Sequence, residues 1–295
     1  MKLVTQTNGV RVRLGEMRGI RLLCESGFDA LDYSMFHIRG MRDDGSVINN
    51  SQYKDHARGL LRLADSYGLT FAQSHAPFPV QREKDKLFNE KMKDVIKRSI
   101  EFAGLIDAGI IVIHPAYYKH KRFERNMEFF LGLEQYARDY GVKIAIENTW
   151  VCDRKGRIIP DILCSRSAEF KKVIDCLDSR YFTACIDVGH SGLVGERADN
   201  LIREMGRRTG CFHIHDNDGR EDLHTLPYTS KLGWDLILKA IADTGYSGCF
   251  TLEADSFFMN LPDEAIPAAL KLMEITGRSM IKKINSFRIK GEADE

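Results

Sequence analysis

The chain contains the segment Cys211-Phe-His-Ile-His-Asp-Asn-Asp218, which continues as Gly219-Arg-Glu-Asp-Leu-His224. Its apolar start, Gly210 to Ile214, predicts a buried β-strand. Three histidines and three aspartates lie in or after this strand: His213, His215, Asp216, Asp218, Asp222 and His224. Imidazole and carboxylate groups are the usual protein ligands of zinc and of harder divalent cations. A polar loop with hydrogen-bonded histidines is the simpler interpretation, but this density of ligand-type side chains favours a metal site.

Outward from this segment, short β-rich runs alternate with longer helical patterns, which is typical of βαβ units and a parallel sheet. The expected strands are Leu3–Gln6, Phe28–Tyr33, Thr70–Gln73, Ile110–Ile113, Val142–Ile146, Phe182–Ile186, Gly210–Ile214 and Gly248–Leu252. The expected helices include 14–25, one ending at Gly68, 84–108, 123–140, 168–177, 198–208, one around Trp234 to Ile241, and a last one starting near Pro262.

Eight such units in 295 residues predict an α/β fold, a single (β/α)₈ TIM barrel. The barrel is expected over residues 1–289, followed by a disordered tail at 290–295. A doubly wound open sheet is the second possibility, but that fold usually carries a glycine-rich first turn. Gln6-Thr-Asn-Gly9 is not such a turn.

The composition narrows the classes of function. The net charge of +1 gives no field that would attract nucleic acid over the whole surface, so a small-molecule substrate is expected instead. Seven cysteines without a Cys-x-x-Cys motif indicate reduced thiols. No signal sequence and no apolar run near 18 residues are present, so we expect a soluble cytoplasmic protein without membrane contact. A homo-oligomer is compatible with the sequence, although no isolated apolar stripe marks an interface.

Polar ligand-type residues stand at the carboxyl ends of six different expected strands: His75, His114, Glu147, Asp187, His213 and Glu253. In a (β/α)₈ barrel these strand ends form one rim, which carries the active site. Residues two positions earlier share a face with them, and four of these are small: Ala145, Cys185, Cys211 and Thr251. We therefore expect these cysteines to fill the barrel interior, with the ligand-type residues converging above them.

Four motifs together resemble the xylose isomerase-like barrel superfamily: Glu147 after strand five, Asp187-Val-Gly-His190, His213-Ile-His-Asp216 and Leu252-Glu253. The resemblance implies a metal-dependent isomerase or epimerase of a sugar, sugar phosphate or keto-sugar. It implies that Glu147, Asp187, His213 and Glu253 hold one divalent cation, with Mn²⁺ as the first expectation and Zn²⁺, Mg²⁺ or Co²⁺ as further candidates. Glu147 and Glu253 would also move the proton through a metal-stabilised enediolate, and His190 would contact the substrate.

The endonuclease IV family offers a second resemblance, in which nine residues hold three zinc ions. All nine have counterparts here: His75, His114, Glu147, Asp187, His190, His213, Asp222, His224 and Glu253. The motifs depart from that family at Val188-Gly189, at Ala254-Asp255 and at Tyr228-Thr-Ser-Lys231, which favours the sugar branch. Asp222 and His224, with His215, would hold extra metal or order the loop over the site.

The same rim is compatible with two more functions. A keto-sugar dehydratase or lyase would begin with the same proton abstraction as the isomerase. A barrel that only binds its ligand would have lost catalysis. For the carbohydrate substrate we expect further contacts from His75, His114, Arg220 and Trp150. The basic run Lys119-His-Lys-Arg122 is either a solvated loop or a site for an acidic group of the substrate.

Overall fold

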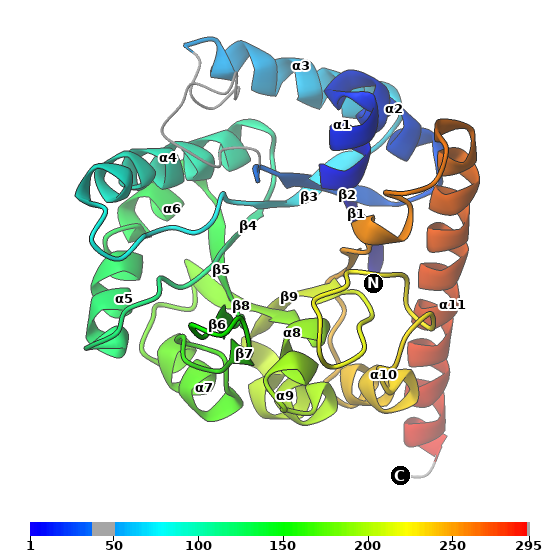
Figure 1. Ribbon diagram of the computed structural model, residues 1–295. Coiled ribbons are helices and arrows are strands. Elements are labelled where there is room, and N and C mark those ends of the chain that lie inside the picture. The colour runs from blue at the N-terminus through cyan, green and yellow to red at the C-terminus, as the bar shows by residue number, and fades with distance from the viewer. Residues whose placement is uncertain (37–50, 294–295) are drawn as a thin grey trace.

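The computed structural model describes residues 1–36 and 51–293, and eight of its strands form a closed barrel (Figure 1). All eight run parallel, in the spatial order β1-β10-β9-β8-β5-β4-β3-β2. They are β1 (Lys2–Gln6), β2 (Ala30–Ser34), β3 (Thr70–His75), β4 (Ile110–Ile113), β5 (Lys143–Glu147), β8 (Phe182–Asp187), β9 (Thr209–Ile214) and β10 (Cys249–Leu252). This confirms the predicted (β/α)₈ barrel.

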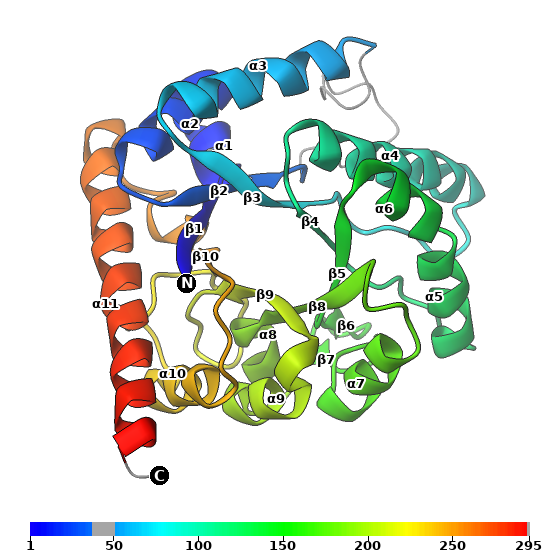
Figure 2. The same cartoon turned by 180° about the vertical axis from the view of Figure 1, so that it is seen from behind.

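Helices surround the barrel, as the two opposite views in Figures 1 and 2 show. They are α1 (Asn8–Leu14), α2 (Glu16–Glu25), α3 (Tyr53–Ser66), α4 (Lys86–Leu105), α5 (Arg122–Leu131), α6 (Glu134–Tyr140), α7 (Ser167–Asp175), α8 (Val188–Leu193), α9 (Ala198–Met205), α10 (Trp234–Asp243) and α11 (Ile266–Ala293), with short 3₁₀ turns η2 (Gly206–Arg208), η3 (Asp255–Phe257) and η4 (Asp263–Ala265). The long helix α11 packs outside β1 and β10, where the barrel closes. No helix in the described part of the chain is long and apolar enough to span a membrane.

The expected helix 14–25 corresponds to α2, with the unexpected helix α1 before it, and the expected helix 123–140 is divided in two. The break between α1 and α2 falls at Gly15, whose φ of +77° ends the first helix and reorients the chain. The expected helix 123–140 is interrupted after Leu131, because Gly132 and Leu133 separate α5 from α6.

Two small elements at the rim were not expected. The long connection after β5 contains an antiparallel hairpin, β6 (Val151–Cys152) with β7 (Ile158–Ile159). The short helix α8 starts directly after β8, and Asp187 is its N-cap, since a side-chain oxygen accepts a hydrogen bond from the His190 N–H at 2.8 Å. Asp187 therefore ends a strand and begins a helix at the same position.

The helix α11 continues to Ala293, into the tail expected at 290–295. No proline interrupts this stretch, so the backbone hydrogen bonds of a long helix propagate through it. Residues 294 and 295 lie outside the described residues.

The barrel has two separate apolar layers. The larger core lies between the sheet and its helices, and a small cluster of Val112, Ala145, Cys185 and Cys211 fills the barrel interior. The two cysteines are fully buried, as expected for interior packing. This small-residue layer supports the polar side chains at the strand ends above it.

Candidate metal centre

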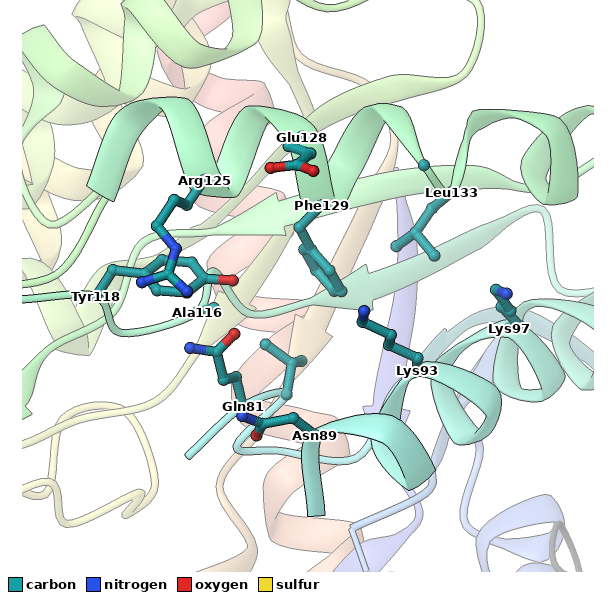
Figure 3. A pocket seen from close by; sticks show the side chains of 12 residues that line it. Gln81, Asn89, Lys93, Lys97, Ala116, Tyr118, Arg125, Glu128, Phe129 and Leu133 are labelled. Carbon is teal, nitrogen blue, oxygen red and sulfur yellow. The ribbon is translucent and has the colours of Figure 1, made fainter. Parts of the chain in front are cut away.

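A large cavity lies away from the barrel mouth. It has a volume of about 430 Å³ and lies between α4 and α5, where Lys93, Arg125 and Phe129 are among its lining residues (Figure 3). None of the site residues predicted from the sequence lines it. A second cavity of about 240 Å³ opens at the carboxyl ends of the strands and is lined by His75, His114, Trp150, His190, Asp222, His224 and both predicted catalytic glutamates. The candidate site residues therefore lie at the smaller cavity.

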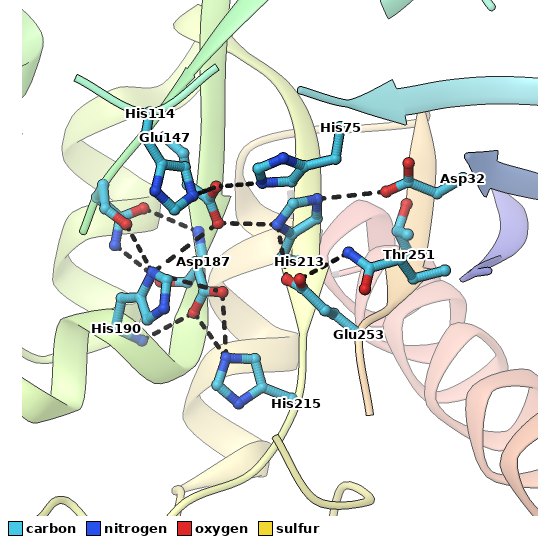
Figure 4. Close-up of polar contacts among 12 residues, drawn as sticks. Asp32, His75, His114, Glu147, Asp187, His190, His213, His215, Thr251 and Glu253 are labelled. Carbon is cyan, nitrogen blue, oxygen red and sulfur yellow. Dashed lines mark hydrogen bonds and ion pairs between the residues drawn. The ribbon is translucent and has the colours of Figure 1, made fainter. Parts of the chain in front are cut away.

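At the floor of this smaller cavity, four residues from four strands converge (Figure 4). One ligand atom each of Glu147, Asp187, His213 and Glu253 lie within 4.8 Å of one another, and all four residues are buried. His213 is central, because its Nδ1 lies 2.8 Å from Glu147 Oε1 and 2.8 Å from Glu253 Oε2. The four residues are the ones that the sequence motifs place at one metal ion.

Glu147 also contacts a second set of histidines. Its Oε2 lies 3.1 Å from His75 Nε2 and 2.8 Å from His114 Nε2. Burial raises the pKa of the Glu147 carboxyl, but the charges of His213 and His114 outweigh this effect and hold the pKa well below its usual range. Glu147 is therefore ionised, and its two oxygens contact different histidines: Oε1 contacts His213, and Oε2 contacts His75 and His114.

Glu253 reaches the centre from the opposite side of His213. Its Oε1 accepts a hydrogen bond from Gln6 Nε2 at 2.6 Å, and its Oε2 faces His213. Burial raises the pKa of this carboxyl as well, and the charge of His213 again lowers it by more. Gln6, at the end of β1, is a contact that the sequence motifs did not indicate.

Asp187 is held from three directions. His215 Nε2 lies 3.0 Å from one carboxylate oxygen, and the His190 N–H donates to the same atom. The Asn148 side chain accepts from the Asp187 N–H and donates to the Asp187 carbonyl. Through these two hydrogen bonds Asn148 joins the ends of β5 and β8.

A second group of ligand-type residues lies beside the first. His190, His215, Asp222 and His224 offer one atom each within 4.8 Å, and a third group contains His75, His114 and Glu147. Asp222 Oδ2 lies 3.3 Å from His190 Nε2 and 3.2 Å from His224 Nε2. The structure thus brings together all nine residues that resemble the trinuclear ligand set.

Asp216 and Asp218, which follow β9, have structural roles instead. Asp216 accepts hydrogen bonds from the backbone of Tyr228, Ser230 and Leu232 and from the Trp234 indole. Asp218 accepts from the N–H groups of Arg220 and Glu221 in a tight turn. Both order the loop after β9, so they are not available as metal ligands.

The donor set fits a divalent cation. Three carboxylates, Glu147, Asp187 and Glu253, are buried within one small volume. No lysine or arginine among the described residues lines the cavity above them. Buried anions in such numbers need positive charge, and oxygen ligands with one imidazole suit a divalent metal. The residues of this chain therefore fit the metal that the motifs imply.

Of the remaining residues predicted to contact the substrate, some line the cavity and others do not. Trp150 lines the cavity with its indole N–H unpaired among the described residues, whereas Arg220 is exposed and does not line it. Arg122 of the basic run pairs with Asp161 and Glu169, which leaves it unsuited to an acidic substrate group. Phe78, which the sequence did not single out, stacks on His114 at 4.7 Å and forms one wall.

Comparison with known proteins agrees with this geometry. A protein of Methanocaldococcus jannaschii, MJ1311, is 25% identical over 207 residues, which cover 66% of this chain and 67% of that protein. The fructoselysine 3-epimerase of Shigella flexneri is 23% identical over 183 residues, covering 60% of this chain and 64% of the enzyme, less than two thirds of its length. A solved structure of L-ribulose 3-epimerase superposes with a TM-score of 0.73 at 16% identity, over 100% of this chain and 98% of that one. The family model described as xylose isomerase-like TIM barrel matches residues 20–275, and the chain therefore belongs to that family.

Proposed function

We propose that this protein is a divalent-metal-dependent isomerase or epimerase of a small sugar or keto-sugar. One observation carries the proposal: Glu147 and Glu253 face each other across His213 Nδ1, each at 2.8 Å, beneath a cavity of about 240 Å³. Related proteins that are named 3-epimerases support the choice of substrate class.

The two glutamates provide the proton transfers. One carboxylate removes the proton from the carbon next to the sugar carbonyl, and the electron pair of that C–H bond moves toward the carbonyl oxygen. The other carboxyl group returns a proton from the opposite side, which inverts the carbon. A bound cation supplies positive charge that lowers the energy of the deprotonated sugar. Phe78 and Trp150 line the cavity and offer apolar surface to a sugar ring.

A solvent-exchange assay tests this proposal. Protein loaded with Mn²⁺ is incubated in D₂O with free ketoses and with ketose phosphates, and the products are followed by NMR. Deuterium should appear at the carbon next to the carbonyl, together with the epimer or the isomeric aldose, and a chelator should stop both. If no sugar in the panel exchanges a proton above the metal-free background, the proposed function is wrong.

A multinuclear phosphodiesterase is the second candidate, and a specific observation favours it. Glu147 belongs both to the group with His75 and His114 and to the group with Asp187, His213 and Glu253. A further group beside them consists of His190, His215, Asp222 and His224. The resemblance to endonuclease IV rests on these residues. The sugar proposal instead gives Asp222 and His224 a role in ordering the loop, which is supported by the hydrogen bond between His224 Nδ1 and the Glu253 carbonyl at 3.0 Å.

Metal stoichiometry separates the two candidates. Elemental analysis of protein purified without chelator should give about one divalent ion per chain, a count that Asp222→Ala and His224→Ala leave unchanged. Two or three zinc ions per chain, reduced by about one in either variant, would favour the phosphodiesterase. Abasic DNA and simple phosphodiesters would then be the first substrates to test.

A further inference from the structure

Asp32 is a buried carboxylate that no motif indicated. It lies in the middle of β2 and is fully buried. Its Oδ2 lies 2.9 Å from Gln73 Nε2 and 3.5 Å from His213 Nε2, and its Oδ1 has no hydrogen-bond partner among the described residues (Figure 4). A buried carboxylate with an unpaired oxygen is costly, so its presence needs a reason other than packing.

The orientation of His213 suggests that reason. Its Nδ1 points between Glu147 and Glu253, so Nδ1 is the atom that would bind the cation. A neutral imidazole that binds metal through one nitrogen carries its proton on the other. That other nitrogen, Nε2, is the atom that faces Asp32.

The neighbouring amide is oriented so that it does not compete for this proton. Thr251 Oγ1 donates to Gln73 Oε1 at 2.8 Å, which turns the Gln73 NH₂ group toward Asp32. The NH₂ group cannot accept from the imidazole, although it lies 3.3 Å from His213 Nε2. Asp32, at 3.5 Å, is therefore the group placed to accept the His213 Nε2–H when Nδ1 binds the cation.

We propose that Asp32 is a positioning residue of the metal centre, which holds the His213 imidazole with Nδ1 free for the cation and makes that nitrogen a stronger ligand. Its negative charge acts through the ring, since a carboxylate that accepts from one imidazole nitrogen raises the basicity of the other. The inference rests on the metal centre of the proposed function and not on the sugar reaction. It would hold equally for the phosphodiesterase.

Metal affinity tests the proposal in the intact protein. The dissociation constant for Co²⁺ is measured by competition with a chelating dye for wild type, Asp32→Asn and Asp32→Ala. We expect about 10-fold weaker binding for Asp32→Asn, which keeps an acceptor oxygen but loses the charge, and up to about 100-fold for Asp32→Ala. Ser34→Ala is the matched control, because Ser34 lies two residues further along β2, is fully buried, and has a hydroxyl without a partner among the described residues. Its affinity should equal that of wild type.

A spectroscopic readout excludes a purely structural role. In the Zn²⁺-loaded protein with ¹⁵N-labelled histidine, the His213 Nε2–H proton should resonate far downfield and move upfield in Asp32→Asn. If Asp32→Ala does not fold, Asp32→Asn alone decides the test.

The inference is overturned if the Co²⁺ affinity of Asp32→Asn stays within twofold of wild type and its Nε2–H resonance does not move. Lack of sugar turnover in wild type together with weakened binding in Asp32→Asn would overturn only the proposed function.

Discussion

Replacing Glu147 or Glu253 with glutamine should lower kcat for sugar epimerisation by about 10²–10⁴-fold, the usual contribution of a positioned general acid or base. Glutamine keeps the size and one oxygen of the side chain but cannot accept and return a proton. Both side chains border the cavity, one on each side of His213, so neither can replace the other. The measurement is turnover of the ketose identified by the exchange assay, at saturating Mn²⁺.

Controls must separate proton transfer from metal binding, because the same glutamates are candidate ligands. Metal content of each variant is measured alongside turnover, and only variants that retain metal are interpreted. Glu16→Gln is the matched control: Glu16 pairs with Arg11 and His56 outside the cavity, and its charge is stabilised there, since its pKa is lowered to about 2. This variant should lose stability but keep kcat. Full turnover in both Glu147→Gln and Glu253→Gln would show that the proton-transfer roles are wrong.

The positions of the ligand-type residues at the strand ends could be predicted from the sequence. Each ligand-type residue follows an apolar run, and barrel geometry brings such positions together whatever their separation in sequence. His75, 72 residues from Glu147 in sequence, lies 3.1 Å from it in space. The small residues Ala145, Cys185 and Cys211 were predictable for the same reason, since alternation puts them on the inner face.

Contacts between side chains of neighbouring strands could not be predicted in this way. Gln6, Asp32 and Gln73 stand at the expected rim, but nothing in their spacing shows that they support His213 and Glu253. The expected strand Phe28–Tyr33 contains two aspartates, Asp29 and Asp32, and nothing in the sequence distinguishes Asp32 from Asp29. The sequence also grouped the aspartates after β9 together as ligand-type residues. Residue type alone does not distinguish Asp216, which orders a loop, from Asp222, which faces the cavity.

At Val188-Gly189 the sequence departs from the endonuclease IV motif, and the structure gives a steric reason for the glycine. A Cβ atom on Gly189 would lie 2.1 Å from the His215 ring, far inside van der Waals contact. The ring cannot easily move away, because it stacks on His224 at 3.9 Å and contacts Asp187. A histidine at 215 therefore requires a glycine at 189. Gly189→Ala should lower the free energy of unfolding by about 3 kcal/mol, measured by urea denaturation of the metal-free protein.

A double-mutant cycle identifies the clash as the cause. His215→Ala removes the ring, so it should be less damaging in the Gly189→Ala background than in wild type, with a coupling of about 2 kcal/mol. Gly192→Ala, in the same short helix, is the control: its Cβ would meet the end of the Leu232 side chain at 3.3 Å and Asn217 Oδ1 at 3.8 Å, and it should change stability by less than about 1 kcal/mol. Additive effects of the Gly189 and His215 substitutions would contradict this account. A coupled result would mean that the Asp187-Val-Gly-His190 motif of this chain cannot be exchanged for a bulkier one unless position 215 changes with it.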